Sequence, residues 1–454
     1  MSATDTLAAF VANLKGEELP AEVQEAAARC LMDNLACALG ASITESGRRW
    51  LALPGGSGPC TLLGSGRTVI LEEAVYLNGN LANLLDFDDT RGGHPGSTVI
   101  PTGLAVAEQY RCSSADLLAA IVVGYEVQVR LFRAFWPSRA RMHLFPKLTL
   151  QTFGAAATAG RLLNLNEQQM AHAFGIAATL APLPKAISSA SGKRRPWYKG
   201  YLGWSARTGL QAALLARMGQ VGPRGVLDGE DGLAASLGTD RFGADALVQD
   251  LGVTYEILKV AFKPYPSCRW THAALDALRN IREAAGVAAE DVEEVVIHLP
   301  PPFHEWLDWR TPASVTDAQF SLPFLAALVL YQWPEAQWWK RDDVVTRPDL
   351  LALSERVVLL PDPGLLRPED QSRTVPARVS VRTRNGAEHR ALVAIPRGEV
   401  SNPLTPGELK GKWDALTVPV LGEQGAEKLA QAVAFLGDNE TAAIFCGLSP
   451  RGSL

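Results

Sequence analysis

The stretch VQEAAARCLMDNLACALG, residues 23–40, has the spacing of a helix that packs against other helices. Its apolar residues recur every three or four positions, so an α-helix would bring them to one face. These residues are Val23, Ala27, Cys30, Leu31, Leu35 and Ala38. We expect this helix to run to Leu39 and to stop at Gly40, because glycine is common just past a helix end.

Further helices are predicted on the C-terminal side of this stretch. Ser113 with Asp116, and Asn166 with Gln169, resemble capping boxes, which mark helix starts. Apolar, alanine-rich runs that suit close helix packing occupy 117–123, 152–163, 170–180 and 206–218. A short strand is expected only at 60–63, after a turn-forming stretch. The sequence therefore predicts a helical body up to about residue 264.

The pattern changes after residue 264. Residues 292–299 alternate and are β-branched, which predicts a strand. Residues 379–384 and 389–395 flank Asn385-Gly386, which predicts a hairpin with a type I′ turn. A further buried helix is predicted at 322–330, between the strand and the hairpin, and the tail returns to a helical pattern at 427–435.

The predicted fold class is mainly α with a smaller α+β domain. In this division residues 1–264 and 397–454 form the all-helical domain, and residues 265–396 form the inserted α+β domain. We see no internal repeat and no low-complexity tract.

Composition excludes several classes of protein. The 454 residues are 47% hydrophobic and 20% charged, which allows a large core. A net charge of −5 argues against nucleic-acid binding and against a polybasic membrane anchor. No apolar run reaches the roughly 18–20 residues of a membrane span, and the N-terminus lacks the basic region of a secretory signal. We expect a soluble protein of the reducing cytoplasm.

Motifs for bound metals and cofactors are also missing from the sequence. The six cysteines form no C-x-x-C pair, so neither a zinc ribbon nor an iron–sulfur site is indicated. Neither G-x-G-x-x-G, nor a P-loop, nor G-x-S-x-G occurs. We therefore expect no metal and no cofactor, and no acyl-serine chemistry.

One acidic segment has the residues for chemistry. Residues 78–101 read NGNLANLLDFDDTRGGHPGSTVIP and include Asp86, Asp88, Asp89 and His94. A solvated loop is one interpretation. A metal–diphosphate motif is another, but it needs a second acidic motif that the sequence lacks. The third is a proton-transfer site in which a carboxylate holds His94.

Two later segments supply lysines. Residues 193–209 read KRRPWYKGYLGWSARTG, where Lys199 stands among aromatic residues just before a predicted helix, a place that attracts anions. Residues 263–272 read KPYPSCRWTH, where two prolines restrict the backbone around Lys263 and Tyr265. The alternatives are a solvated loop for the first segment and an interdomain linker for the second. We expect His272 to be a packed histidine.

Taken in order, nine stretches resemble the MmgE/PrpD family. They are LNGNLANLLDFDDT, HPGSTVIPTGLAVAE, GYEVQVR, FGAAATAGRLLNL, WYKGYLGWSARTGLQAALLA, GPRGVLDGEDGL, KPYPSCRWTH, FSLPF and PRGEVSNPLTPGEL. The resemblance spans almost the whole chain. It implies an all-helical domain formed by both chain ends, a smaller α+β lid domain and a homodimer.

The resemblance also implies cofactor-free chemistry on small polycarboxylates. Family activities include 2-methylcitrate dehydratase, cis-aconitate decarboxylase and iminodisuccinate epimerase, which all make or break a C–H bond beside a carboxylate. Such reactions need fixed cations for the charge that develops and an acid or base for the proton. We expect a lyase of a di- or tricarboxylic acid by dehydration or decarboxylation. The alternatives are an epimerase of a substituted succinate and a relative that only binds a metabolite.

The family's site residues map onto this sequence by resemblance. Lys199 and Lys263 would bind substrate carboxylates, and His94 would transfer a proton. Asp86 would orient or tune His94. Thr90 and Tyr265 would contact substrate.

Three positions depart from the family pattern. Asn83 stands where the family often has a histidine. Phe145 precedes Pro146 where many members have a second catalytic histidine, so His143 would have to act from a shifted position. Phe324 replaces a common tyrosine. These changes put methylcitrate dehydration in particular in doubt.

Overall fold

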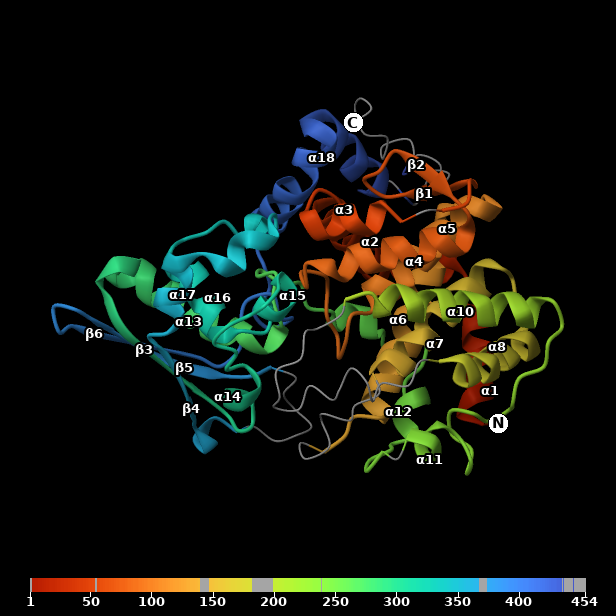
Figure 1. Cartoon of the computed structure of the whole chain (residues 1–454). Helices are drawn as coiled ribbons and strands as arrows, with labels where there is room; N and C mark the ends of the chain where they lie inside the picture. Colours follow the sequence, from red (N-terminus) through yellow and green to blue (C-terminus); the bar gives the residue numbers. More distant parts are fainter. Residues whose placement is uncertain are drawn as a thin grey trace.

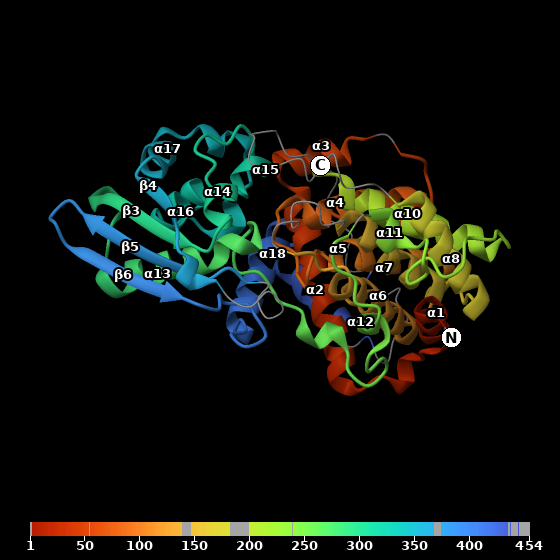
Figure 2. The same ribbon diagram turned by 90° about the horizontal axis from the view of Figure 1, so that it is seen from below.

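The computed structural model describes residues 2–53, 55–138, 147–181, 199–237, 239–366, 374–434, 436 and 444. Two views at right angles show a bundle of helices on one side and a small sheet with its own helices on the other (Figures 1 and 2). This is the mainly α architecture with a smaller α+β part that the sequence predicts.

The bundle contains most of the described helices and one short hairpin. The helices are α1 (Ala3–Asn13), α2 (Ala21–Ser42), α3 (Glu45–Leu51), α4 (Leu71–Leu84), α5 (Gly96–Tyr110), α6 (Ser114–Ala134), α7 (Lys147–Leu162), α8 (Glu167–Leu180), α10 (Tyr201–Arg217), α11 (Leu233–Leu237), α12 (Asp245–Val248) and α18 (Pro406–Ala434). The hairpin pairs β1 (Cys60–Leu62) with β2 (Arg67–Val69). The helices predicted from periodicity are present within the described residues, which do not include Phe435 at the end of the predicted helix 427–435.

Cap signals in the sequence mark two helix starts correctly. The Ser113 hydroxyl accepts a hydrogen bond from the Asp116 backbone N–H at the start of α6. Asn166 and Gln169 form a reciprocal capping box at the start of α8. These side chains satisfy N–H groups that the first turn of a helix leaves unpaired, which is why the pattern is readable in sequence.

The prediction that Gly40 ends its helix is wrong. Helix α2 continues through Gly40 to Ser42. A β-carbon at Gly40 would lie 2.5 Å from the Leu416 side chain of α18. The glycine therefore serves close packing between the N-terminal and C-terminal parts of the chain rather than helix termination.

A second close approach leads to a test of stability. In α10, a β-carbon at Gly203 would lie 2.0 Å from the backbone oxygen of Tyr76 in α4. We expect Gly203→Ala to lower the free energy of unfolding by roughly 1–3 kcal/mol, because a backbone atom cannot move aside easily. Gly411→Ala is the control, since nothing lies within 4 Å of its added carbon. Chemical denaturation that shows equal effects for both variants would contradict this packing argument.

The sheet has four strands in the order β4-β3-β5-β6. They are β3 (Val292–Leu299), β4 (Val357–Pro361), β5 (Ala377–Thr383) and β6 (Glu388–Val393). β3 runs parallel to β4 and antiparallel to β5, and β5 runs antiparallel to β6. The helices of this part are α13 (His272–Ala285), α14 (Phe303–Trp306), α15 (Val315–Ala318), α16 (Leu322–Leu330) and α17 (Pro348–Ser354). Helix α13 packs against β5, β6 and α16.

The predicted strand 292–299 and hairpin are confirmed, but the turn type is wrong. Arg382 pairs with Glu388, and Thr383 N–H donates to the Ala387 carbonyl, which leaves a three-residue loop. Only Gly386 in this loop has a positive φ, of 88°. Asn385 instead uses its side-chain oxygen to accept hydrogen bonds from the Thr383 hydroxyl and the Ala387 N–H, which favours the longer turn.

The C-terminal helix α18 returns to the bundle and packs on α2. Its buried Lys412 donates hydrogen bonds to Asp33 of α2 at 2.6 Å and to the Phe87 carbonyl at 2.7 Å. Phe87 belongs to the loop between α4 and α5, so the end of the chain supports that loop. The exact division at residues 264 and 397 stays a prediction. Among the described helices, none is long and apolar enough to cross a membrane.

Candidate active site

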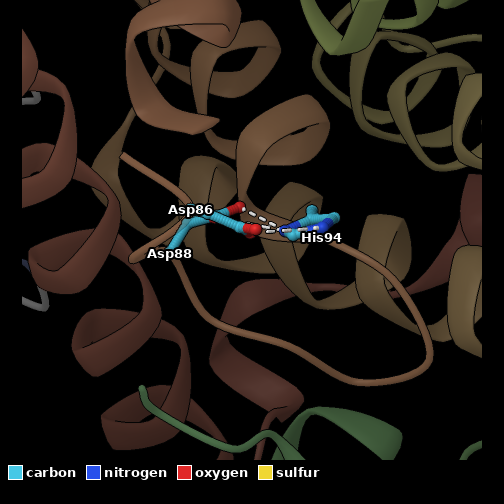
Figure 3. A group of neighbouring side chains, drawn as sticks. All are labelled: Asp86, Asp88 and His94. Atoms are coloured by element: carbon cyan, nitrogen blue, oxygen red, sulfur yellow. Dashed lines mark hydrogen bonds and ion pairs between the residues drawn. The ribbon is translucent and has the colours of Figure 1, made fainter. Parts of the chain in front are cut away.

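The loop between α4 and α5 brings three polar side chains together. Asp86, Asp88 and His94 all project from this loop, and both carboxylates point toward the imidazole (Figure 3). Asp86 has a φ of 53°, in the left-handed region that an aspartate adopts only rarely. The backbone of Thr90 pairs with that of Ala261 through two hydrogen bonds of 2.9 Å, which fixes the loop against the segment that carries Lys263.

Two lysines distant in sequence converge on Asp86. The Lys263 ammonium lies 2.7 Å from Asp86 Oδ1 and also donates to the Asp86 backbone oxygen at 2.9 Å. Lys199 Nζ lies 3.5 Å from Asp86 Oδ2 and donates to the Asn83 carbonyl at 3.0 Å. The side chains of these three charged residues are at most 3% exposed. The site is therefore a buried group of charges and not a solvated loop.

His94 is held by Asp88. Its Nδ1 lies 3.0 and 3.1 Å from the two oxygens of Asp88, while its Nε2 is 3.8 Å from Asp86 Oδ1. Asp88 also accepts hydrogen bonds from the Ser97 hydroxyl at 2.6 Å and the Asn83 amide at 3.1 Å. The His94 side chain is 16% exposed, more than any of the other charged groups of this cluster.

The charges of the cluster are coupled. Burial alone would raise the pKa of Asp86, but Lys199, Lys263 and His94 outweigh it and hold that pKa well below its usual range. Burial also opposes ionisation of Asp88, yet His94 lowers the Asp88 pKa to about 2. Because Asp88 is ionised at neutral pH and can only accept, His94 Nδ1 must donate to it. Nε2 is then left for proton transfer.

The orienting contact to His94 therefore comes from Asp88, whereas Asp86 mainly balances the two lysines. The role predicted for Asp86, orienting or tuning His94, stays a hypothesis. Its 3.8 Å separation from Nε2 still permits an electrostatic influence on the ring.

The hydroxyls of Thr90 and Tyr265, the two predicted substrate contacts, hydrogen-bond within the protein, and their contact with substrate stays a prediction. The Thr90 hydroxyl donates to the Gly93 carbonyl at 2.8 Å within the loop. The Tyr265 hydroxyl donates to Asp276 at 2.9 Å and accepts from Arg397, and its ring is 1% exposed. Neither hydroxyl has a hydrogen bond to the Asp86 cluster among the described residues.

Of the three positions that depart from the family pattern, Asn83 and Phe324 are among the described residues, and they lie in different environments. Asn83 contacts both Asp88 and His94 Nδ1, so it belongs to the cluster. Phe324 is fully buried in α16. His143 and Phe145 lie outside the described residues, and the proposed role of His143 stays a prediction. His272 is fully buried, as a packed histidine should be.

Several supporting residues escaped sequence reasoning. Gln151 of α7 accepts a hydrogen bond from the His94 backbone N–H at 2.9 Å. Gln319, beside α16, donates to the Leu84 carbonyl at 2.9 Å, so the α+β part also supports the loop. Ser97 lay in the acidic segment without being singled out. Asp88 was named there, but the sequence did not show that it is the carboxylate bound to His94 Nδ1.

The geometry also bears on the metal interpretation of the acidic run. Ligand atoms of Asp86, Asp88 and His94 lie within 4.8 Å of one another. However, Asp86 already faces two buried ammonium groups, and Asp88 already accepts hydrogen bonds from three side chains. A divalent cation here would be repelled by both lysines, so the cluster fits an anion better than a metal.

Comparisons with known proteins cover most of the chain. The model of the MmgE/PrpD N-terminal domain matches residues 5–243, and that of the MmgE/PrpD C-terminal domain matches residues 265–438. Human cis-aconitate decarboxylase is 27% identical over 387 residues, which cover 83% of this chain and 78% of that protein. Cis-aconitate decarboxylase of Aspergillus terreus is 25% identical over 463 residues, or 95% of this chain and 92% of that protein. The cis-aconitate decarboxylase-like protein oryM of Aspergillus oryzae is 25% identical over 468 residues, with 95% and 93% covered.

Proposed function

Because this chain belongs to the MmgE/PrpD family, we propose that it is a cofactor-independent lyase that decarboxylates a small polycarboxylic acid of the cis-aconitate type. The observation that carries the proposal is the convergence of Lys199, Lys263 and His94 on Asp86. The relatives named cis-aconitate decarboxylase support this choice of reaction, since they align over at least 83% of the chain.

The lysine pair suits the charge that such a reaction creates. When the C–C bond breaks, CO₂ leaves and the electron pair stays on carbon, where it spreads into the double bond and a neighbouring carboxylate. Two buried ammonium groups can stabilise that anion without reorganising. In the free protein Asp86 balances them, so a substrate carboxylate shares or takes over its contacts.

Proton delivery falls to His94. Asp88 fixes Nδ1, and Nε2 is the nitrogen left to protonate the carbanion and form the new C–H bond. Protonation at the far end of the delocalised system shifts the double bond. The ionised Asp88 also stabilises the imidazolium that must exist before the transfer.

Dehydration and epimerisation also create a negative charge beside a carboxylate, which the same two lysines could stabilise. One assay in D₂O separates the reactions, with cis-aconitate, citrate, methylcitrate and iminodisuccinate as substrates and proton NMR as the readout. Decarboxylation releases CO₂ and places one deuterium on carbon in the product. A product with a new double bond and no CO₂ would identify a dehydratase instead. Deuterium exchange or epimerisation without loss of water or CO₂ would identify an isomerase. Binding without turnover would identify a non-catalytic relative.

The pH dependence of kcat/KM should report the ionisation of Lys199. Burial, joined by the like charge of Lys263, lowers the pKa of Lys199 to about 8 although Asp86 opposes the shift. Above that pH the ammonium loses its proton and its attraction for carboxylate, so kcat/KM should fall on the basic side of about pH 8. In Lys199→Arg, which stays charged, any residual activity should lose this basic limb. An unchanged limb in the arginine variant would show that another group titrates.

The predicted homodimer and cytoplasmic location are further proposals from the family resemblance. Light scattering of the purified protein tests the first, and fractionation of the source cells tests the second.

A further inference from the structure

A third lysine stands at the start of the helix that contacts the His94 loop. Lys147 is the first residue of α7, and Gln151 follows it by one helical turn on the same face. The Gln151 side chain accepts a hydrogen bond from the His94 backbone N–H, so this face of α7 is turned toward the catalytic loop. The next residue, Leu148, packs on Tyr201 and Leu202 at the start of α10, close in sequence to Lys199.

The charged neighbours of Lys147 are those of the site. Burial lowers the pKa of its ammonium, and Cys268, Asp86 and Lys263 act on it electrostatically. Among the described residues, its ammonium has neither a hydrogen bond nor an ion pair. A lysine in the first turn of a helix is also opposed by the helix dipole. Within the described part of the chain, the attraction of Asp86 is therefore opposed by burial, by Lys263 and by the helix dipole, and no contact offsets these costs.

The charged side chains of the site do not balance, because it holds more ammonium groups than ionised carboxylates. Asp86 and Asp88 are ionised. The ammonium groups of Lys199 and Lys263 lie against Asp86, and Asp86 also attracts that of Lys147. Burial and the nearby carboxylates of Asp33 and Asp88 raise the pKa of Asp89 well above the usual range, which disfavours its charged form. The two carboxylates of Asp86 and Asp88 and the three lysine ammonium groups leave one positive charge uncompensated. A ligand carboxylate would supply the missing negative charge.

We propose that Lys147 binds one carboxylate of the substrate, beside those bound by Lys199 and Lys263, and thereby selects tricarboxylic over dicarboxylic acids. This inference rests on the proposed function, since it names the substrate class of the same site. Lys147 is a specificity residue in this scheme, because its contact exists both before and during the reaction.

Two unreactive probes test the proposal by calorimetry. Tricarballylate carries three carboxylates, and glutarate is the same chain without the central one. The wild-type protein should bind tricarballylate about 10- to 100-fold more tightly than glutarate, as expected for one buried charge-assisted contact. Lys147→Met should bring the two dissociation constants to within a few-fold of each other, whereas Lys147→Arg should keep most of the preference.

Two controls separate this role from a structural one. Without ligand, Lys147→Met should melt at the wild-type temperature or higher, because the variant loses an unpaired cation. Lys410→Met, on an exposed lysine of α18, should leave both affinities unchanged. A wild-type preference that survives in Lys147→Met would overturn this inference alone. Failure of the wild-type protein to bind either probe would overturn the proposed function together with it.

Discussion

Lys263→Met should abolish turnover and weaken the fold at the same time. The Lys263 ammonium is 2.7 Å from Asp86, and its side chain is 1% exposed. Removing one partner of a buried ion pair typically costs about 3–5 kcal/mol, because the other charge stays buried without compensation. Lys199 still lies 3.5 Å from Asp86, so we expect the lower end of that range. Loss of one transition-state donor should lower kcat/KM by about 10²–10³-fold or more.

Loss of activity and loss of stability can be separated with a double variant. Asp86→Asn combined with Lys263→Met removes both charges and keeps similar volumes. Chemical denaturation should show that only part of the lost stability returns, because Lys199 then loses the charge of Asp86. The value of kcat/KM should stay as low as in Lys263→Met. If the double variant regains activity along with stability, Lys263 is a structural cation and the proposed mechanism is wrong.

His94→Asn should have the opposite profile, with a large loss of rate and little loss of stability. General acid catalysis commonly contributes about 10²–10⁴-fold, and kcat should fall by that factor. The His94 side chain is partly exposed, and Asp88 would keep its bonds from Ser97 and Asn83, so the fold should tolerate the change. We expect the free energy of unfolding to change by less than about 1 kcal/mol.

A histidine outside the site provides the matched control for His94. The side chain of His304, in α14, is 18% exposed, against 16% for His94. His304→Asn should leave kcat unchanged. Equal losses of rate in the two variants, or unfolding of His94→Asn, would argue that His94 supports the structure rather than the reaction.

Local rules explain which parts of the fold were predictable. Caps such as Ser113 and strands such as 292–299 depend on neighbours within a few residues, so their signals lie in the sequence itself. The errors at Gly40 and Asn385 have different causes. Gly40 faces Leu416, nearly four hundred residues away, whereas Asn385 forms side-chain hydrogen bonds that outweigh the simplest turn.

The sequence predicted which residues form the site, but not which of them contact one another. The acidic segment and the two lysines were recognisable as residue types suited to charge and proton transfer. Their pairing was not, because Asp86, Asp88 and Asp89 are near neighbours with the same side chain. Burial and contacts give them three different environments: Asp86 balances lysines, Asp88 holds His94, and the pKa of Asp89 is raised well above its usual range.

By itself, the sequence determined the helical body, the strands of the smaller part and the set of groups available for chemistry, since these follow from local periodicity and side-chain type. Only the tertiary structure decided that Lys199 and Lys263 meet at one carboxylate, and that the charges of Asp86 and Lys263 also act on Lys147, which has no hydrogen bond or ion pair to a described residue. The physical reason is that electrostatic energy depends on distance and burial in space. Residues 86, 147, 199 and 263 come within reach of one another only when α7, α10 and the loop after α4 are packed together.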